Sequence, residues 1–172
     1  MKIKNYVHAF LLFAVTASAV GATNTIKETT GGPDTAPLVM NIAAGIIASN
    51  GSATPGAVIG LNTRLTERGP IYLGGEFGAF VATGTPSYAM FPLLASGYYQ
   101  FELGTGVHPL LGAMVGPVFS TAAGSSVQLE LLFRPGFNFE VGRRFVINVE
   151  PRLGVIGSSF VFVPQLGVIL AM

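Results

Sequence analysis

Nearly every charged residue between positions 64 and 152 has an even number, and this alternation is the strongest constraint on the fold. The even-numbered charged residues are Arg64, Arg68, Glu76, Glu102, Glu130, Arg134, Glu140, Arg144, Glu150 and Arg152. The exceptions, Glu67 and Arg143, stand in expected turns. Successive side chains of a β-strand point to opposite faces, so strands with this pattern separate two environments. The odd-numbered face is apolar.

Composition indicates that one of these environments is a membrane. Hydrophobic residues make up 50% of the 172 residues and charged residues only 10%, whereas soluble domains carry about 25% charge. A surface in contact with water needs more charge than this. The net charge of +1 gives no indication of nucleic acid as a partner. The chain has no cysteine, which excludes disulfides and thiolate metal sites.

The chain divides into three expected parts. Residues 1–22 have a basic start, a short apolar stretch and small residues, the pattern of a cleaved secretory signal peptide. Residues 23–37 are polar and lack periodicity, which is typical of a flexible leader. Residues 38–172 consist of apolar segments separated by turn formers, with no helical period. The strands expected in this part are 38–49, 56–66, 71–82, 91–103, 106–119, 127–141, 145–156 and 160–172.

Two other architectures compete with a membrane barrel. A helical bundle is disfavoured because glycines and prolines interrupt every long apolar stretch and the charges form no helical stripe. A secreted, lipocalin-like barrel would keep its apolar face inside and its even-numbered face in water. That face carries many glycines and leucines between its charges, so it is too apolar for a solvated exterior. The pattern favours the reverse, with the charges inside a closed barrel whose apolar face meets lipid.

The end of the chain carries a motif that suits this interpretation. Gln165, Gly167, Leu170 and Met172 match the polar, glycine and terminal hydrophobic positions of a C-terminal assembly signal. Together with the alternating strands, this motif resembles the small eight-stranded bacterial outer-membrane barrels of the OmpA/OmpX-like kind. The chain departs from the usual signal by ending in methionine where an aromatic residue is expected. The predicted fold is therefore an all-β, eight-stranded, antiparallel, up-and-down transmembrane β-barrel.

The resemblance also implies a location and partners. It implies residence in the outer membrane of a Gram-negative bacterium, with the N- and C-termini in the periplasm. It implies contact with outer-membrane lipids and with the barrel assembly machinery during insertion, and a monomer rather than an oligomer. No cofactor is expected.

The inward charges predict a network inside the barrel. We expect Glu76, Glu130, Arg134, Glu150 and Arg152 to form ion pairs, because buried charges must be paired. Nearer the periplasm, the expected lumen residues are Arg64, Glu102 and His108. An eight-stranded barrel leaves little more room than its own side chains need, so the hypothesis is a network that closes the lumen. The alternative is a wet pore lined by loosely paired charges.

No constellation of residues indicates catalysis. His108 is the single histidine after the expected signal peptide, and it stands on the inward face without a neighbouring serine, so a structural role is favoured over a catalytic one. No cluster has metal-ligand spacing. The expected function is a non-enzymatic contribution to envelope structure or surface properties. A narrow channel for ions or very small solutes and a lipid-modifying enzyme are the alternatives.

Prolines stand inside several of the expected strands, where they remove a hydrogen bond from the ladder. If the turn before residue 145 is tight, Pro135 and Pro151 lie opposite each other on the lipid-facing side. We expect a bulge or kink at that point.

Overall fold

The computed structural model describes residues 38–65, 70–83, 87–104, 106–121, 126–142 and 145–172, so the expected signal peptide and leader lie outside the described residues. These ranges contain eight strands: β1 (Leu38–Ser49), β2 (Ser52–Arg64), β3 (Ile71–Ala82), β4 (Tyr88–Gln100), β5 (Val107–Ser120), β6 (Ser126–Gly142), β7 (Phe145–Ile156) and β8 (Ser159–Ala171). They contain no helix that is long and apolar enough to cross a membrane.

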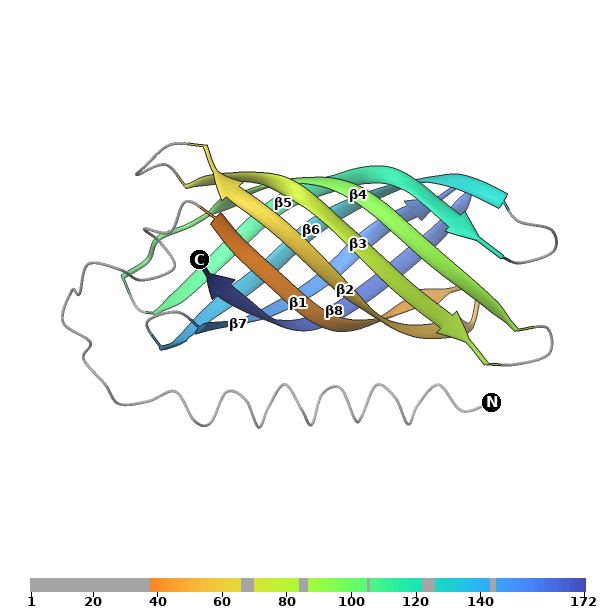
Figure 1. Ribbon diagram of the computed structural model, residues 1–172, viewed down its shortest axis with the longest axis horizontal. Coiled ribbons are helices and arrows are strands. Elements are labelled where there is room, and N and C mark those ends of the chain that lie inside the picture. The colour runs from red at the N-terminus through yellow and green to blue at the C-terminus, as the bar shows by residue number, and fades with distance from the viewer. Residues whose placement is uncertain (1–37, 66–69, 84–86, 105, 122–125, 143–144) are drawn as a thin grey trace. The chain divides into compact units, whose positions relative to one another are not determined.

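The strands form one closed barrel in chain order (Figure 1). Every neighbouring pair is antiparallel, and β1 pairs with β8 to close the ring. The N–H of Met172 donates to the carbonyl of Leu38 at 3.1 Å, so the start of β1 and the end of β8 lie at the same end of the barrel. The predicted all-β, eight-stranded, up-and-down architecture is confirmed.

Three strands have the predicted bounds, and the largest differences concern β2 and β4. The segment from Asn50 to Pro55 was expected to be a connection, but β2 already begins at Ser52. The turn needs only Asn50 and Gly51, whose φ angles of 46° and 80° suit the two central positions of a tight hairpin turn. β4 lies three residues earlier than expected and ends at Gln100.

Two tight turns reverse the parity of the inward-facing residues in the first and last strands. Ser49 pairs with Ser52, and Ile156 pairs with Ser159, so each of these turns has two central residues. A turn of that length joins an odd-numbered residue to an even-numbered one. Odd-numbered residues therefore point inward in β1 and β8, whereas even-numbered residues point inward from β2 to β7.

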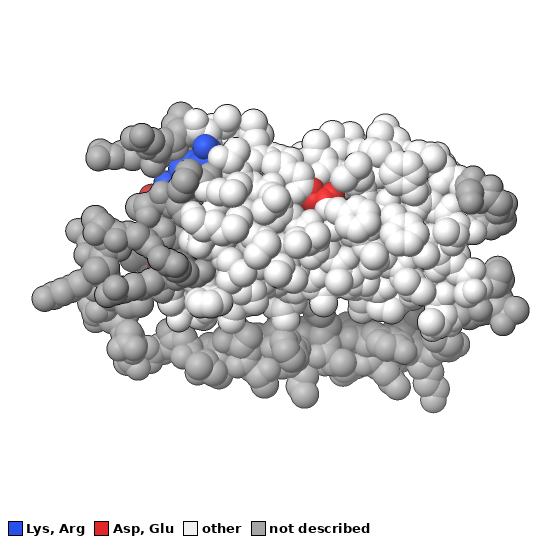
Figure 2. All heavy atoms as spheres, viewed as in Figure 1, with Lys and Arg blue, Asp and Glu red and all other residues white. Residues whose placement is uncertain are grey.

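The two faces of the wall differ completely in character. Large apolar side chains cover the outside and stay solvent-exposed in the isolated chain, as Phe133 does with 49% of its surface accessible. In the view of Figure 2 most of the described outer wall is white, the colour of residues that are neither acidic nor basic. The inside holds the buried charges and amides together with two clusters of buried apolar side chains.

Prolines coincide with the gaps in the hydrogen-bonded ladder. Between β6 and β7 the paired positions stop at Phe133↔Leu153 and resume at Phe137↔Val149. That gap places Pro135 opposite Pro151, and neither residue has an N–H to donate. The register is the same on both sides of the gap, so the chain gains no extra residue there.

Of the expected bulge or kink at Pro135 and Pro151, the bulge is not found there, although the ladder is interrupted at both prolines. The register of β6 against β7 shifts between Glu140 and Gly142 instead, next to the end of the strand. A bulge needs an additional residue in one strand, whereas a facing pair of prolines only removes hydrogen bonds. Pro151 also faces Pro164 of β8, so three prolines lie side by side across β6, β7 and β8.

Candidate functional site

The centre of the lumen holds a chain of ion pairs between two arginines and two glutamates. Arg134 of β6 donates to both oxygens of Glu150 of β7, with Nε–Oε2 at 2.7 Å and Nη2–Oε1 at 2.6 Å. Arg152 Nε donates to Glu150 Oε2 at 2.7 Å. Arg152 also binds Glu76 of β3 through Nη1 and through Nη2, the latter 2.8 Å from Oε2. The order of the network is therefore Arg134, Glu150, Arg152, Glu76.

This network crosses the barrel. β3 and β7 are four strands apart in a closed ring of eight, so Arg152 and Glu76 start from opposite walls. Glu150 and Arg152 have no accessible surface, Arg134 keeps 1% and Glu76 keeps 6%. Two positive and two negative charges balance, and the fork-like geometry of each guanidinium suits paired carboxylate oxygens. The four side chains thus close the lumen at this level.

Glu130 was expected in the same network but does not join it. It lies on β6, four residues nearer the β5–β6 connection than Arg134, and its lateral neighbours are Gly116 and Ile156. Neither neighbour carries a charge. Glu130 is 1% exposed, and its Oε2 atom has no hydrogen-bond partner among the described residues. Among the described residues no hydrogen bond or ion pair joins Glu130 to an arginine, and Arg152 and Glu76 act on it through longer-range charge interactions.

Two tyrosines continue the network toward the chain ends. The guanidinium of Arg134 lies 4.6 Å from the ring centre of Tyr98, and the Tyr98 ring stacks on Tyr72 at 4.8 Å with an angle of 3°. Arg64 lies 5.2 Å from the Tyr72 ring and donates to its hydroxyl through Nε and Nη2, at 3.1 and 2.6 Å. Cation–π contacts strengthen when water is excluded, so this column joins the half-buried Arg64 to the central network.

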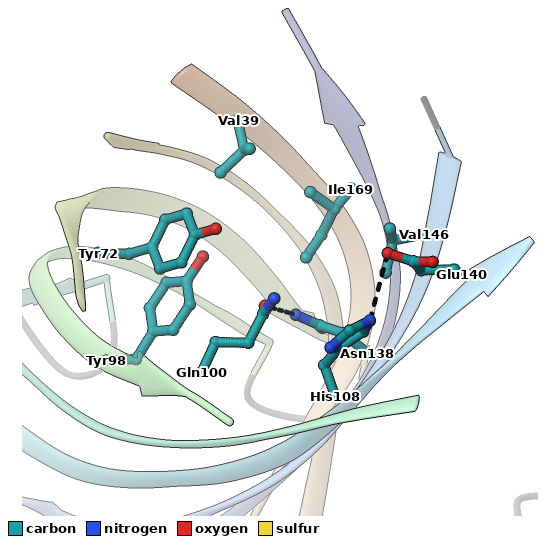
Figure 3. A pocket seen from close by; sticks show the side chains of 9 residues that line it. All are labelled: Val39, Tyr72, Tyr98, Gln100, His108, Asn138, Glu140, Val146 and Ile169. Carbon is teal, nitrogen blue, oxygen red and sulfur yellow. Dashed lines mark hydrogen bonds and ion pairs between the residues drawn. The ribbon is translucent and has the colours of Figure 1, made fainter. Parts of the chain in front are cut away.

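Amides and a histidine fill the lumen near the same end. Asn138 Nδ2 donates to Gln100 Oε1 at 2.7 Å, and Asn148 Nδ2 donates to Asn138 Oδ1 at 2.6 Å. His108 Nε2 lies 3.2 Å from Glu140 Oε1. Figure 3 shows Gln100, Asn138, His108 and Glu140 around a small cavity, with the tyrosine pair on its opposite side. Its volume of about 10 Å³ is room for roughly one water molecule.

The remaining predicted positions divide into lumen and rim. His108 lies inside and is buried, as expected, whereas Glu102 follows the last residue of β4 and is exposed at the barrel end. Glu102 was misplaced because the expected strand ran three residues too far. The sequence reasoning missed the two tyrosines and the three amides. Their number parity, which is even in β3 to β7, was the available signal.

The C-terminal motif occupies the last part of β8. Gln165 and Gly167 point inward and are buried, and Leu170 lies on the outer face. Met172 follows the strand and keeps 54% of its surface exposed. These positions fit the alternation of β8, and a role in assembly stays a prediction.

The lumen offers no evident place for a metal. Among the described residues, no group of three or more histidine, aspartate or glutamate side chains is arranged to hold an ion. The central carboxylates of Glu76 and Glu150 are already bound to arginines. The geometry defines a class of protein: a closed, eight-stranded antiparallel barrel with an apolar outer wall and a polar, filled interior.

Solved structures with this architecture match the chain. Neisserial surface protein A (NspA) aligns with a TM-score of 0.62 and 14% identity, over 78% of this chain and 96% of that one. The N-terminal β-barrel domain of Pseudomonas aeruginosa OprF aligns with a TM-score of 0.54 and 15% identity, over 77% and 96%. A designed transmembrane β-barrel aligns with a TM-score of 0.50 and 12% identity, over 84% and 98%.

These matches show the fold of small outer-membrane barrels. No protein-family model matches the sequence, and a search of the curated proteins finds no match. One fold can host many functions, and the designed barrel has the same fold as this chain. The function must therefore be argued from the wall and the lumen.

Proposed function

We propose that this protein is a non-enzymatic, monomeric β-barrel of a bacterial outer membrane that contributes to envelope structure or surface properties. The observation that carries the proposal is the outer wall, where large side chains such as Leu131, Phe133 and Phe137 are all about half exposed in the isolated chain. A contiguous apolar surface around a whole barrel is unfavourable in water and favourable in lipid. The closed ladder suits the same environment, because lipid offers no partner for an exposed strand edge.

The filled lumen favours a structural role over conduction. The central ion pairs lie between two apolar clusters, one containing Phe80, Met114 and Val161 and the other containing Tyr72 and Leu110. An ion would have to displace both apolar layers and the paired charges between them. This arrangement supports the side-chain plug rather than the narrow channel.

The surroundings of His108 favour a structural role for that residue. A serine hydrolase needs a serine within hydrogen-bond reach of its histidine. The described residues around the small cavity include tyrosine, glutamine, asparagine and glutamate but no serine. With Nε2 beside Glu140, the imidazole packs as an interior polar group.

The proposed location sets the expected partners. Outer-membrane lipids would cover the apolar wall, and the barrel assembly machinery would recognise the last strand, including Gln165, Gly167, Leu170 and Met172. With eight strands the two chain ends share one side, which we place in the periplasm. The hairpin ends at Asn50-Gly51 and Gly157-Ser158 would then face outward.

Planar-bilayer conductance of the refolded protein tests the closed lumen. The wild-type protein is expected to be silent, and so is a Glu150→Gln/Arg152→Gln variant, because the apolar layers on both sides of the network remain. A steady single-channel current from the wild-type protein would contradict the proposal and favour the channel.

Labelling of intact cells tests the orientation. The chain contains no cysteine, so a Ser158→Cys variant carries one thiol, at the β7–β8 turn. An impermeant maleimide is expected to label it in whole cells. A Gly142→Cys variant, whose thiol lies at the opposite end of the barrel, is expected to react only after the outer membrane is opened. The reverse result would invert the topology.

A further inference from the structure

The end of the barrel that carries the two tight turns is hollow. A cavity of about 190 Å³ opens there between β1, β2, β4, β6, β7 and β8. We call it the loop-end cup. The cavity near the opposite end, shown in Figure 3, measures only about 10 Å³. The barrel therefore fills its lumen almost completely on one side and leaves room for a ring-sized molecule on the other.

The floor of the loop-end cup is apolar and sealed. Ile47, Ile156 and Val161 line it and belong to the apolar cluster of the lumen, and Met90 packs against the same cluster. Water above such a floor has few hydrogen-bond partners, and an apolar group that displaces poorly ordered water gains affinity. The floor therefore favours a ligand with one apolar face.

The rim of the loop-end cup is polar and partly fixed. Thr54 Oγ1 and Tyr88 Oη share a hydrogen bond of 3.0 Å that ties β2 to β4. Ser52 Oγ donates to the carbonyl of Ser49 at 2.8 Å. Asn50 at the β1–β2 turn, Gln128 and Ser159 complete the polar lining. Hydroxyls and carboxamides both donate and accept hydrogen bonds, so the rim suits a partner with several hydroxyl groups.

The loop-end cup lacks charge. None of the described residues that line it is ionisable at neutral pH. The four connections at this end, residues 50–51, 83–87, 121–125 and 157–158, contain no acidic or basic residue in the sequence. A charged ligand would lose its hydration without gaining a counter-charge. We propose that the loop-end cup binds a neutral, hydroxyl-rich ring the size of a single sugar, with its apolar face on the floor and its hydroxyls at the rim.

Chemical-shift titration of the refolded, isotope-labelled protein tests this site. The protein is held in phosphocholine micelles, because a maltoside detergent would itself present sugar rings. The probe is methyl β-D-glucopyranoside, and glucuronate, glucosamine and hexanol are the charged and apolar comparators. Saturable shifts are expected with the neutral glycoside at the amides of Ser52, Tyr88, Gln128 and Ser159, and weaker binding is expected for all three comparators.

Two variants and a matched control locate the binding. Tyr88→Phe and Gln128→Met remove polar atoms while nearly keeping the volume, and each is expected to weaken binding about two- to tenfold, the effect of one lost hydrogen bond. Tyr99→Phe makes the same change on the outer face of β4 and is expected to leave binding unchanged. Amide spectra show that each variant is folded. The proposal is overturned by an absence of saturable shifts, by equal weakening in the control, or by tighter binding of any comparator.

Discussion

Replacing Glu150 with glutamine should destabilise the barrel more than any other single change of charge in the lumen. Its carboxylate accepts three hydrogen bonds, two from Arg134 and one from Arg152. The neutral amide of Glu150→Gln would leave two buried guanidiniums with Glu76 as the one ionised partner in the network. It would also present an NH₂ group to a donor.

The expected magnitude follows from the burial of the network. Removing one partner of a buried ion pair costs about 3–5 kcal/mol, because it leaves an uncompensated charge. Replacing both partners of a buried ion pair with apolar groups of similar size is often neutral or stabilising. An Arg134→Met/Glu150→Met variant leaves the balanced pair of Arg152 and Glu76, so it should recover much of the loss. The double variant should therefore be clearly more stable than Glu150→Gln alone.

Glu130→Gln is the matched control, since it makes the same chemical change in the same lumen. The Glu130 carboxylate is also buried, but among the described residues no hydrogen bond or ion pair joins it to an arginine, and Arg152 acts on it only through a longer-range charge interaction. Its conversion should alter the free energy of unfolding by less than about 1 kcal/mol, or stabilise the protein, because no buried cation loses a hydrogen-bonded partner. Urea unfolding in lipid vesicles, followed by tyrosine fluorescence and by gel mobility, measures all four proteins. Equal losses for the Glu150 and Glu130 variants would refute the network as the source of the effect.

Three further tests, two of them with a control variant, examine other parts of the barrel by the same unfolding measurement. Tyr98→Ala should cost about 3–5 kcal/mol, since it removes a buried ring between a guanidinium and a second ring, and Tyr98→Phe should cost much less; similar losses would contradict the stacking argument. Gly154→Ala should severely destabilise the barrel because the new Cβ would clash with the carbonyl oxygen of Leu131, whereas Gly142→Ala, with open space around it, should be nearly neutral. Gly51→Ala should cost about 1–2 kcal/mol, the penalty for a side chain in the left-handed region; an unchanged stability would show that the turn has another conformation.

Much of the fold was predictable because the alternation of side chains between the two faces of a barrel wall can be read within each strand. Each strand alternates between the outer wall and the lumen, so the faces of β3, β6 and β7 follow directly from residue numbers. The reversal of parity in β1 and β8 was harder to foresee. It depends on whether a turn has two central residues, and the polar stretch from Asn50 to Pro55 suggested a longer connection.

The site was predictable in composition and only partly in geometry. Parity placed Glu76, Arg134, Glu150 and Arg152 inside, and two ionic pairs were the arrangement that balanced their charges. Which side chains share a height depends on strand tilt and stagger, which the sequence does not state. For that reason Glu130 was included among the residues of the expected ion-pair network. The loop-end cup was not predicted because the residues that line it are neutral and resemble ordinary turn formers.

The central network also compensates for a weakness in the wall. Pro135 and Pro151 face each other between β6 and β7, so the backbone bonds that would join the strands there are missing. Arg134 and Glu150, each adjacent to one of these prolines, join the same two strands through a bidentate side-chain bond. A slip of one of these strands by one residue would turn its own charge to the outer wall and leave the other charge unpaired in the lumen; in the proposed membrane, an arginine at the midplane costs about 2–4 kcal/mol. The ion pair thus fixes the register where the ladder does not.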